Sequence, residues 1–370
     1  SNKIVILYDD EAAGGDGTAI VGTVSGTSIS FGTEVVFESH AIQGTYRGGA
    51  VFDSSANKIV ITYVQYNTDS GASTAQAIVG TVSGTSISFG SKVAYNGTTA
   101  AVLAGGIAFD SNSNKVVVAY KDGDNSSIGP GKAIVGTVSG TSISFGSPTT
   151  FTDYSVDSIA GTFDSNSNKV VFMYHSKTGS SSGTTQGKVI VGTVSGTSIS
   201  FGSEVIVTTG TTYYTDISFN STANKVLLSY GDVANNWYGT LRVGTVSGTS
   251  ISLDTAEVFN TSESDGWYGN VYDSVSNKHI LVYRDRGNSN YGTARVKNVA
   301  SPAGTTLTSS NYIGISDAAY SHGATATVQL PGSVDDAQSG LTAGQSYFIQ
   351  NDGSLATTAA SPAVLAGVGV

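Results

Sequence analysis

Short apolar runs and alternating segments follow one another along the whole chain, each time in the same order. In the third copy, Lys115–Tyr120 and Ala133–Val138 are nearly unbroken β-branched runs, whereas Ser142–Phe151 begins by alternating polar and apolar residues. Unbroken short runs are typical of strands buried on both faces, and alternation is typical of a half-exposed strand. Upstream, Gly106–Asp110 is rich in small residues. Each unit therefore predicts four short strands.

The pattern is an internal repeat with a period of roughly 55 residues. The stretch Val-Gly-Thr-Val-Ser-Gly-Thr-Ser-Ile-Ser occurs five times without change, at Val21–Ser30, Val79–Ser88, Val135–Ser144, Val191–Ser200 and Val243–Ser252. An Asn-Lys pair recurs with it, ending at Lys3, Lys58, Lys115, Lys169, Lys225 and Lys278. Solenoid coils are the alternative, but they repeat roughly every 20–30 residues.

The order of the strands within a unit predicts an all-β fold, a β-propeller of four-stranded antiparallel blades. Small residues suit an inner strand that converges on a common axis, and an alternating strand suits the outer edge of a blade. Six blades are expected, with seven or eight as alternatives. The repeat starts part-way through a unit, so we expect the chain to belong to a longer one. Asn311–Ser316 has the composition of the inner strand that the first unit lacks, and is expected to complete the first blade and close the ring.

Two domains are expected. Residues 1–316 form the propeller, and residues 317–370 leave the repeat and form a small C-terminal β module. This module is too short to bury much core alone.

Composition excludes several classes of function. The net charge of −10 argues against nucleic acid or an anionic membrane surface as a partner. With no cysteine there are neither disulfides nor thiolate metal sites, and no apolar run is long enough to span a membrane. We expect no cofactor.

The connections between strands are of two kinds. The Ser-Gly-Thr-Ser turn and the turn before each Asn-Lys pair hardly vary, whereas the other two connections differ in length and content from copy to copy. In an up-and-down blade these variable connections emerge on one face. Loops on a rigid scaffold commonly carry recognition, although tolerated drift in solvated loops is the alternative.

The variable connections hold the candidate binding residues. These are Tyr46, Arg47, Asp157, Tyr213, Tyr214, Trp237, Asp265, Trp267 and Tyr268, with Tyr66, Tyr154, Asn235 and Asn236 nearby. Aromatic planes stack on the apolar faces of sugars, and Asp or Asn accepts hydrogen bonds from hydroxyls. Packing is the alternative: Tyr238 matches Tyr291 in register, so aromatics here can simply hold their loops.

Signs of catalysis and metal binding are weak. Asp10, Asp122, Asp232 and Asp285 each follow a tyrosine by two residues and are expected to cap turns. Asp122–Asn125 lacks the spacing of a calcium loop. The four histidines form no metal or triad motif, so we expect no enzyme activity, although two distant carboxylates of a glycosidase stay an open alternative.

The repeat resembles those of tail-fibre-like virion proteins of bacteriophages, marine ones in particular. The resemblance rests on Phe109–Tyr120 with Ala133–Gly146, and on Tyr312–Tyr320 with Ser333–Thr358 of the C-terminal module. It implies a protein of the virion surface, outside the cell, that contacts the host envelope and other virion proteins. It brings no catalytic residue.

Two functions follow from these observations. The first is attachment to the host, in which the variable face recognises a host receptor, expected to be a cell-surface glycan. The second is a purely structural or decorating role in the virion. A glycan-degrading enzyme is a weaker third, and homo-oligomerisation is left open.

Overall fold

The computed structural model describes most of the chain, which divides into two compact units, Ser1–Val299 and Ala300–Val370. The described residues of the first unit are 2–42, 49–66, 73–95, 103–123, 129–177, 185–264 and 268–299. Those of the second are 315–316, 328–329, 340–349, 355–358 and 364–368. The unit boundary at 299/300 precedes the expected domain boundary at 316.

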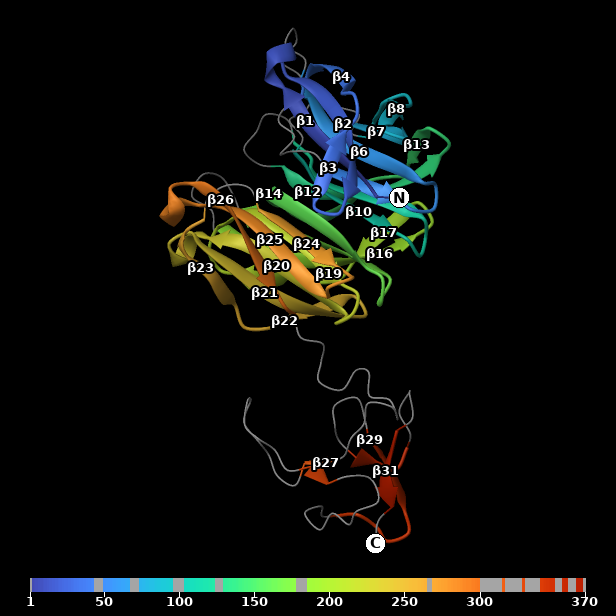
Figure 1. Cartoon of the computed structure of the whole chain (residues 1–370), viewed down its shortest axis with the longest axis vertical. Coiled ribbons are helices and arrows are strands. Elements are labelled where there is room, and N and C mark those ends of the chain that lie inside the picture. Colours follow the sequence, from blue (N-terminus) through green and yellow to red (C-terminus); the bar gives the residue numbers. More distant parts are fainter. Residues whose placement is uncertain are drawn as a thin grey trace. The chain divides into compact units, whose positions relative to one another are not determined.

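The first unit consists of six successive groups of antiparallel strands, coloured from blue to orange in Figure 1. The second strands are β1 (Lys3–Asp10), β6 (Lys58–Tyr66), β11 (Lys115–Lys121), β15 (Lys169–Lys177), β20 (Lys225–Asp232) and β25 (Lys278–Asp285). The third strands are β2 (Asp16–Ser25), β7 (Ser73–Ser83), β12 (Pro130–Ser139), β16 (Thr185–Ser195), β21 (Tyr238–Ser247) and β26 (Tyr291–Lys297). Inner strands are β5 (Gly49–Asp53), β10 (Leu103–Asp110), β14 (Thr149–Asp164), β19 (Thr212–Asn220) and β24 (Gly269–Asp273).

The outer edge of each blade has two parts. The hairpin strands are β3 (Ser28–Phe31), β8 (Ser86–Phe89), β13 (Ser142–Phe145), β17 (Ser198–Phe201) and β22 (Ser250–Leu253). The edge strands are β4 (Val35–Ala41), β9 (Val93–Ala94), the start of β14, β18 (Val205–Thr208) and β23 (Glu257–Glu263). Both parts pair with the same third strand, so the expected continuous strand Ser142–Phe151 is wrong: it breaks after Phe145.

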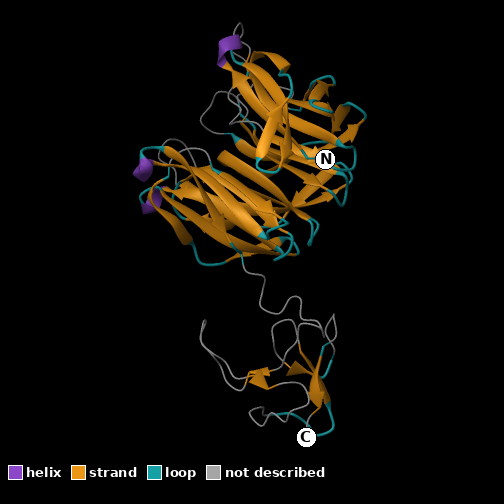
Figure 2. Cartoon of the chain, viewed as in Figure 1, coloured by secondary structure: helices purple, strands orange, loops and turns teal. Residues whose placement is uncertain are grey.

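The six groups are the blades of a β-propeller, as the sequence predicted. Successive inner strands pack side by side: a Cβ on Gly49 or Gly106 would meet Ile107 or Ile159 of the next blade. Strands make up almost all the regular structure in Figure 2, and the 3₁₀ helices that the structure describes, η1 (Glu11–Ala13), η3 (Val233–Asn235) and η4 (Arg286–Asn288), are one turn each. Blades 3 and 4 share one sheet because β14 runs from the outer edge of blade 3 into the inner strand of blade 4.

Packing between blades explains the constant turn. The Ser-Gly-Thr turns of blades 2 to 5 each pack against the glycine that follows the hairpin strand of the preceding blade. A Cβ on Gly146 would lie 2.1 Å from the carbonyl oxygen of Thr197, a distance that the backbone does not tolerate. In blade 5 Asp254 stands at this glycine's position, and no Ser-Gly-Thr turn follows in blade 6. The constant stretch is therefore scaffold, held by its contacts with neighbouring copies.

We expect Gly146→Ala to destabilise the propeller by about 1–3 kcal/mol, because the new methyl group must push the turn of the next blade away. Gly292→Ala is the matched control, since a Cβ there would meet no atom within 4 Å. Urea unfolding followed by circular dichroism measures both variants. Equal losses in the two would contradict the packing of turn on glycine.

The outward faces of the end blades are apolar. Ile29 of blade 1 is 46% exposed, whereas its counterpart Ile87 in blade 2 is 3% exposed because blade 1 covers it. Ile280 and Val282 of blade 6 are exposed in the same way. The exposed face of blade 1 is the one that every other blade turns toward the preceding blade. The exposed face of blade 6 is the one that every other blade turns toward the following blade.

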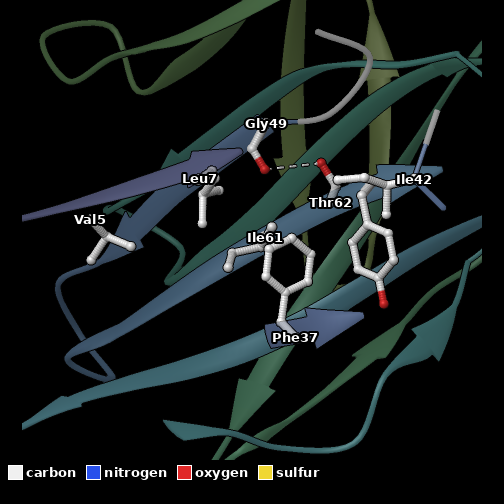
Figure 3. A pocket seen from close by; sticks show the side chains of 9 residues that line it. Val5, Leu7, Phe37, Ile42, Gly49, Ile61 and Thr62 are labelled. Carbon is white, nitrogen blue, oxygen red and sulfur yellow. Dashed lines mark hydrogen bonds between the residues drawn. The ribbon is translucent and has the colours of Figure 1, made fainter. Parts of the chain in front are cut away.

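Strand β1 pairs only with β2 among the described residues, so the first blade has no inner strand there. Beside it lies an apolar cavity of about 280 Å³, lined by Val5, Leu7, Phe37, Ile42, Gly49, Ala50, Ile61, Thr62 and Tyr63 (Figure 3). Within the expected closing strand, residues 311–314 are outside the described residues, and β27 (Ile315–Ser316) pairs with β28 (Val328–Gln329). Closure of the ring by this segment stays a prediction.

The second unit is all β where the structure describes it. Its remaining strands are β29 (Ser346–Ile349), β30 (Leu355–Ala356) and β31 (Leu365–Val368), with β29 in the middle of a three-stranded sheet.

Candidate ligand-binding site

The structure describes five of the nine predicted binding residues: Asp157, Tyr213, Tyr214, Trp237 and Tyr268. Tyr46, Arg47, Asp265 and Trp267 lie outside the described residues. The segments containing Asp157 and Tyr213–Tyr214 were expected to be loops but lie within β14 and β19. The correction matters because a residue of a strand is held more firmly than one on a loop.

Asp157 and Tyr213 occupy the same position in successive inner strands, just before a β-bulge. The register of β14 shifts between Asp157 and Ala160, and that of β19 shifts between Tyr213 and Asp216. Within these bulges Ser158 and Tyr214 have φ values of 49° and 54°. A bulge of this kind re-aims the neighbouring side chain, so both strands present a residue at the variable face.

Hydrogen bonds join the two bulges across the blade boundary. The amide of Thr215 donates to Ser158 Oγ at 2.9 Å, and the Thr215 hydroxyl donates to the Ser158 carbonyl oxygen. Thr215 thus bonds to Ser158 through both its backbone amide and its side chain. Because the bulges are fixed to each other, the positions of Asp157 and Tyr213 are fixed too.

Trp237 lies on a short loop whose backbone is bonded on both sides. Asp232 caps η3 by accepting from the amide of Ala234, and the Trp237 amide donates to the Asp232 carbonyl at 2.9 Å. The Trp237 carbonyl accepts from the amide of Ser264 at 2.8 Å. The φ of Trp237 is 60°, a left-handed conformation that is unfavourable for a bulky residue.

The equivalent loops of blades 1 and 6 show which residue types usually occupy this left-handed backbone position. Each also starts with a capping aspartate and one 3₁₀ turn, and each then has two residues in the left-handed region. Gly15 and Asn290 stand where blade 5 has Trp237, and both residue types tolerate that region. Trp237 is thus in a strained position that other copies give to Gly or Asn. Strain of this kind is found most often at functional sites.

Tyr213, Tyr214 and Trp237 form what we call the aromatic shelf. The rings of Tyr213 and Trp237 are stacked, with centroids 5.2 Å apart and planes 8° apart. The Tyr214 ring lies 6.1 Å from that of Tyr213. Tyr213 is 38% exposed, so the shelf presents an apolar surface to solvent at the variable end of blades 4 and 5.

Polar groups flank the shelf. His175 is the cross-strand partner of Asp157, and its buried ring lies 5.5 Å from the Tyr213 ring. Burial lowers the pKa of His175, and Lys177 and Lys121 lower it further against the opposing effect of Asp157. Lys121 Nζ is 3.7 Å from Asp157 Oδ1. The Asp157 side chain is 42% exposed, so its carboxylate can accept hydrogen bonds from a ligand beside the shelf.

Tyr268 has a packing role, as the alternative interpretation of the loop aromatics expected. Its hydroxyl donates to the Ser264 carbonyl at 2.9 Å, and its ring stacks on that of Tyr283. Burial raises the pKa of the Tyr268 hydroxyl. Tyr268 therefore holds the loop that bonds to Trp237. Tyr154 lies apart from the shelf, under the ammonium of Lys188.

Asp216 is the residue at which the regular pairing of β19 with β20 resumes after the bulge. Its carboxylate accepts from the amides of Ile217 and Asn270 at 2.8 and 2.6 Å. Burial raises the pKa of Asp216 to about 6, against the opposing effect of these two hydrogen bonds. Asp216 therefore releases its proton at a higher pH in the folded chain than in the unfolded chain.

We expect Asp216 to make stability fall as the pH rises from about 4 to about 6, by on the order of 2 kcal/mol. The folded chain binds the proton more tightly than the unfolded chain, so the stabilisation is present at low pH and lost above the folded pKa. Asp216→Asn should remove this part of the pH dependence. Urea unfolding of both proteins at pH 4 and pH 7 measures it, and the same change in both would contradict the assignment.

Other predicted polar motifs have structural roles. Asp10, Asp232 and Asp285 cap their 3₁₀ turns, as expected. Asp122 pairs with Lys132, and the turn that it was expected to cap lies outside the described residues. In the part of the chain that the structure describes, no group of three metal-ligating residues lies together. Part of the Asp122–Asn125 segment is outside that part. No described helix is long and apolar enough to cross a membrane.

Sequence reasoning missed His175 and Lys121. Both lie near the end of the second strand of their blades, at the position of Gly231 in blade 5, and that position looked like the edge of a buried run. A signal was available, because the residue at this position differs from blade to blade although the strand before it is similar in every copy. Comparing this position across the copies could have found both residues.

Comparisons with known proteins agree with the fold. No family model and no curated protein matches the chain. Among solved structures, the BP39L lectin from Burkholderia pseudomallei aligns with a TM-score of 0.53 at 12% identity, over 81% of this chain and 79% of that one. A mutant of AofleA from Arthrobotrys oligospora aligns with a TM-score of 0.50 at 11% identity, over 80% and 87% of the two chains. A sialidase from Trypanosoma rangeli, in complex with sialic acid, gives a TM-score of 0.49 at 11% identity, over 77% and 50%. At these identities the likeness concerns the fold, which is that of a β-propeller.

Proposed function

We propose that the chain is a carbohydrate-binding propeller that attaches to a cell-surface glycan through the aromatic shelf and Asp157. The observation that carries this proposal is Trp237, a strained residue stacked on an exposed tyrosine where the equivalent loops have Gly15 and Asn290. A stacked aromatic surface beside a solvent-accessible carboxylate suits a sugar ring and its hydroxyls. The likeness to a lectin in fold is consistent with this function.

The proposed binding is without catalysis. Asp157 is within 3.7 Å of the Lys121 ammonium, and the sequence carries no catalytic motif. Display on a bacteriophage virion is part of the proposal and rests on the resemblance of the repeat alone. The glycan would then belong to the host envelope.

A glycan array tests the proposal. The purified chain should bind a restricted set of immobilised glycans, and Tyr213→Ala should remove the signal. Tyr154→Ala is the control, since this tyrosine is also exposed at the variable end but lies outside the shelf. An array without any bound glycan, or with binding that survives Tyr213→Ala, would contradict the assignment of the shelf.

A structural role in the virion is the second candidate, and one observation favours it. The exposed apolar faces of blades 1 and 6 would suit contact with other protein surfaces. Sedimentation at increasing concentration tests this. A chain that stays monomeric at all concentrations and also binds glycans would favour attachment over assembly.

A further inference from the structure

A carboxylate lies against the last tyrosine of the second strand in blades 2 and 4, supplied by blade 4 itself in one case and by the neighbouring blade 1 in the other. In blade 4 the Tyr174 hydroxyl donates to Glu204 Oε1 at 2.5 Å, and Lys188 Nζ lies 2.6 Å from Glu204 Oε2. In blade 2 the Tyr63 hydroxyl donates to Glu38 of blade 1 at 3.1 Å, and Lys92, which stands at the position of Glu204, lies with its Nζ 2.7 Å from the same carboxylate. Tyrosine, lysine and carboxylate thus meet at both places, although blade 2 draws the lysine and the carboxylate from other positions than blade 4.

Blade 3 keeps the tyrosine and the lysine but lacks this carboxylate. Tyr120 and Lys132 stand at the positions of Tyr174 and Lys188 in blade 4. The segment Phe201-Gly-Ser-Glu204 reads Phe145-Gly-Ser-Pro148 in blade 3, so proline replaces the glutamate. The place that the Glu204 side chain fills in blade 4 is therefore left open.

A pocket of about 520 Å³ lies there. It is lined by Val93, Ala94, Tyr95, Tyr120, Lys132, Ile134, Ile143, Ser144, Phe145, Gly146 and Pro148. This volume is within the range of small-molecule sites in proteins. Tyr95 packs edge-on against Tyr120, with ring centroids 5.5 Å apart, and the Phe145 ring lies at the same distance from Tyr95. The walls are aromatic and aliphatic, as a ligand site generally is.

The polar groups of this pocket are donors. Tyr95 is 6% exposed, and its buried hydroxyl has no hydrogen-bond partner among the described residues. Leaving such a donor unpaired costs about 1–3 kcal/mol, and a ligand that accepts its hydrogen bond would recover this energy. Lys132 supplies an ammonium, which is shared with Asp122. A buried donor beside a cation favours an acceptor that carries a negative charge.

We propose that this pocket binds a small molecule by its carboxylate, which takes the place that Glu204 fills in blade 4. Tyr120 and Lys132 would then make the contacts that Tyr174 and Lys188 make with Glu204. The carboxylate can belong to an acidic sugar or to the end of a peptide. The pocket shares no residue with the aromatic shelf, so the proposal stands apart from the proposed function.

Calorimetric titration with matched pairs of compounds tests the proposal. Glucuronate is compared with glucose, and N-acetylglycine with its amide. At least one carboxylate should bind with at least a tenfold higher affinity than its neutral partner. Binding of glucuronate alone assigns the site to acidic sugars, and binding of N-acetylglycine alone assigns it to peptide carboxylates.

Two variants locate the binding. Pro148→Glu supplies the missing carboxylate, so it should weaken ligand binding at least tenfold while raising the melting temperature. Lys132→Gln should weaken binding at least fivefold. Tyr154→Ala, which lies outside both this pocket and the aromatic shelf, should leave it unchanged. If neither carboxylate binds, or if Pro148→Glu binds as well as the wild type, the proposal is wrong.

Discussion

Replacement of Trp237 by asparagine is expected to weaken glycan binding at least tenfold while leaving the stability of the propeller within about 1 kcal/mol of the wild type. Two opposing effects produce the small change in stability. Asparagine tolerates the left-handed backbone that tryptophan adopts at a cost of about 1–2 kcal/mol. The stacking on Tyr213, worth about 0.5–1.5 kcal/mol, is lost. Binding loses the Trp237 ring, on which the exposed Tyr213 ring is stacked.

The same substitution has a precedent within the chain, because Asn290 occupies the equivalent position in blade 6 with φ of 63°. Thermal unfolding and titration with a glycan from the array measure the two quantities separately. Tyr291→Ala is the control, since Tyr291 follows Asn290 as the first residue of β26 and is largely exposed. A stability loss of several kcal/mol in Trp237→Asn, with unchanged binding, would make Trp237 a packing residue.

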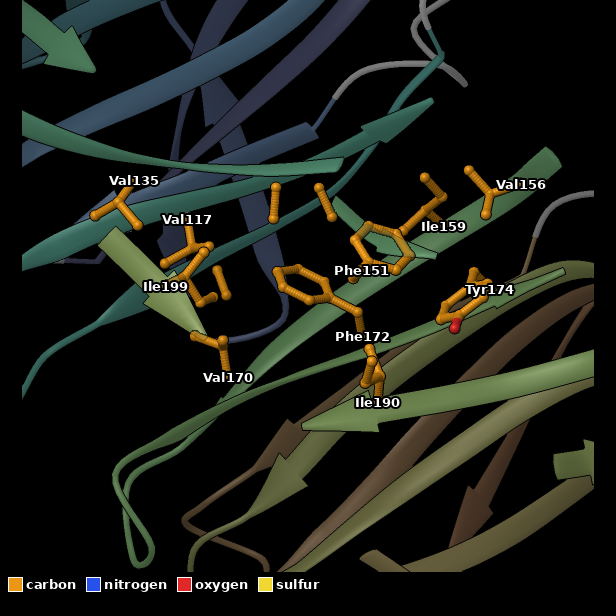
Figure 4. Packing of buried hydrophobic residues seen from close by; sticks show 13 residues of the cluster. Val117, Val135, Phe151, Val156, Ile159, Val170, Phe172, Tyr174, Ile190 and Ile199 are labelled. Atoms are coloured by element: carbon orange, nitrogen blue, oxygen red, sulfur yellow. The ribbon is translucent and has the colours of Figure 1, made fainter. Parts of the chain in front are cut away.

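Replacement of Phe172 by alanine is expected to destabilise the propeller by about 3–5 kcal/mol. Phe172 lies fully buried between blades 3 and 4, among Val117, Phe151, Ile159 and other residues shown in Figure 4. Its ring fills the space beside Gly106 and Gly161, where a Cβ would come within 3.0 Å of the ring. Alanine would leave a cavity that these rigid inner strands cannot close.

Phe52→Ala is the matched control for Phe172→Ala. Phe52 lies in the inner strand β5 but is 58% exposed, so we expect a change within about 0.5 kcal/mol. Urea unfolding, with the midpoint and slope compared, measures both variants. Similar losses at the two positions would contradict the placement of the core between blades 3 and 4.

Most of the fold could be predicted from the repeat. Strand β11 is buried along its whole interior, and the hairpin strand β13 alternates, as the sequence patterns indicated. The break after Phe145 could not be predicted, because it depends on the turn of the next blade, which rests on Gly146. A contact between two blades cannot be read from the hydrophobic pattern of either blade alone.

The site could be predicted only in part, for a similar reason. The variability of the connections identified Asp157, Tyr213, Tyr214 and Trp237 as residues of one face. It could not separate the shelf from Tyr268, which has the same residue type but is held by Ser264 and Tyr283. The bulges that aim Asp157 and Tyr213 depend on backbone conformation at Ser158 and Tyr214, and serine and tyrosine, unlike glycine and asparagine, give no sequence signal for positive φ.

Fluorescence of Trp237 tests the central claim most directly. The chain has two tryptophans, so Trp267→Phe leaves Trp237 as the sole one. If the shelf holds the sugar, titration of this variant with a glycan from the array should change the emission of Trp237 in a saturable way, with the dissociation constant found by calorimetry. A glycan that binds by calorimetry without any change in Trp237 emission would contradict the account.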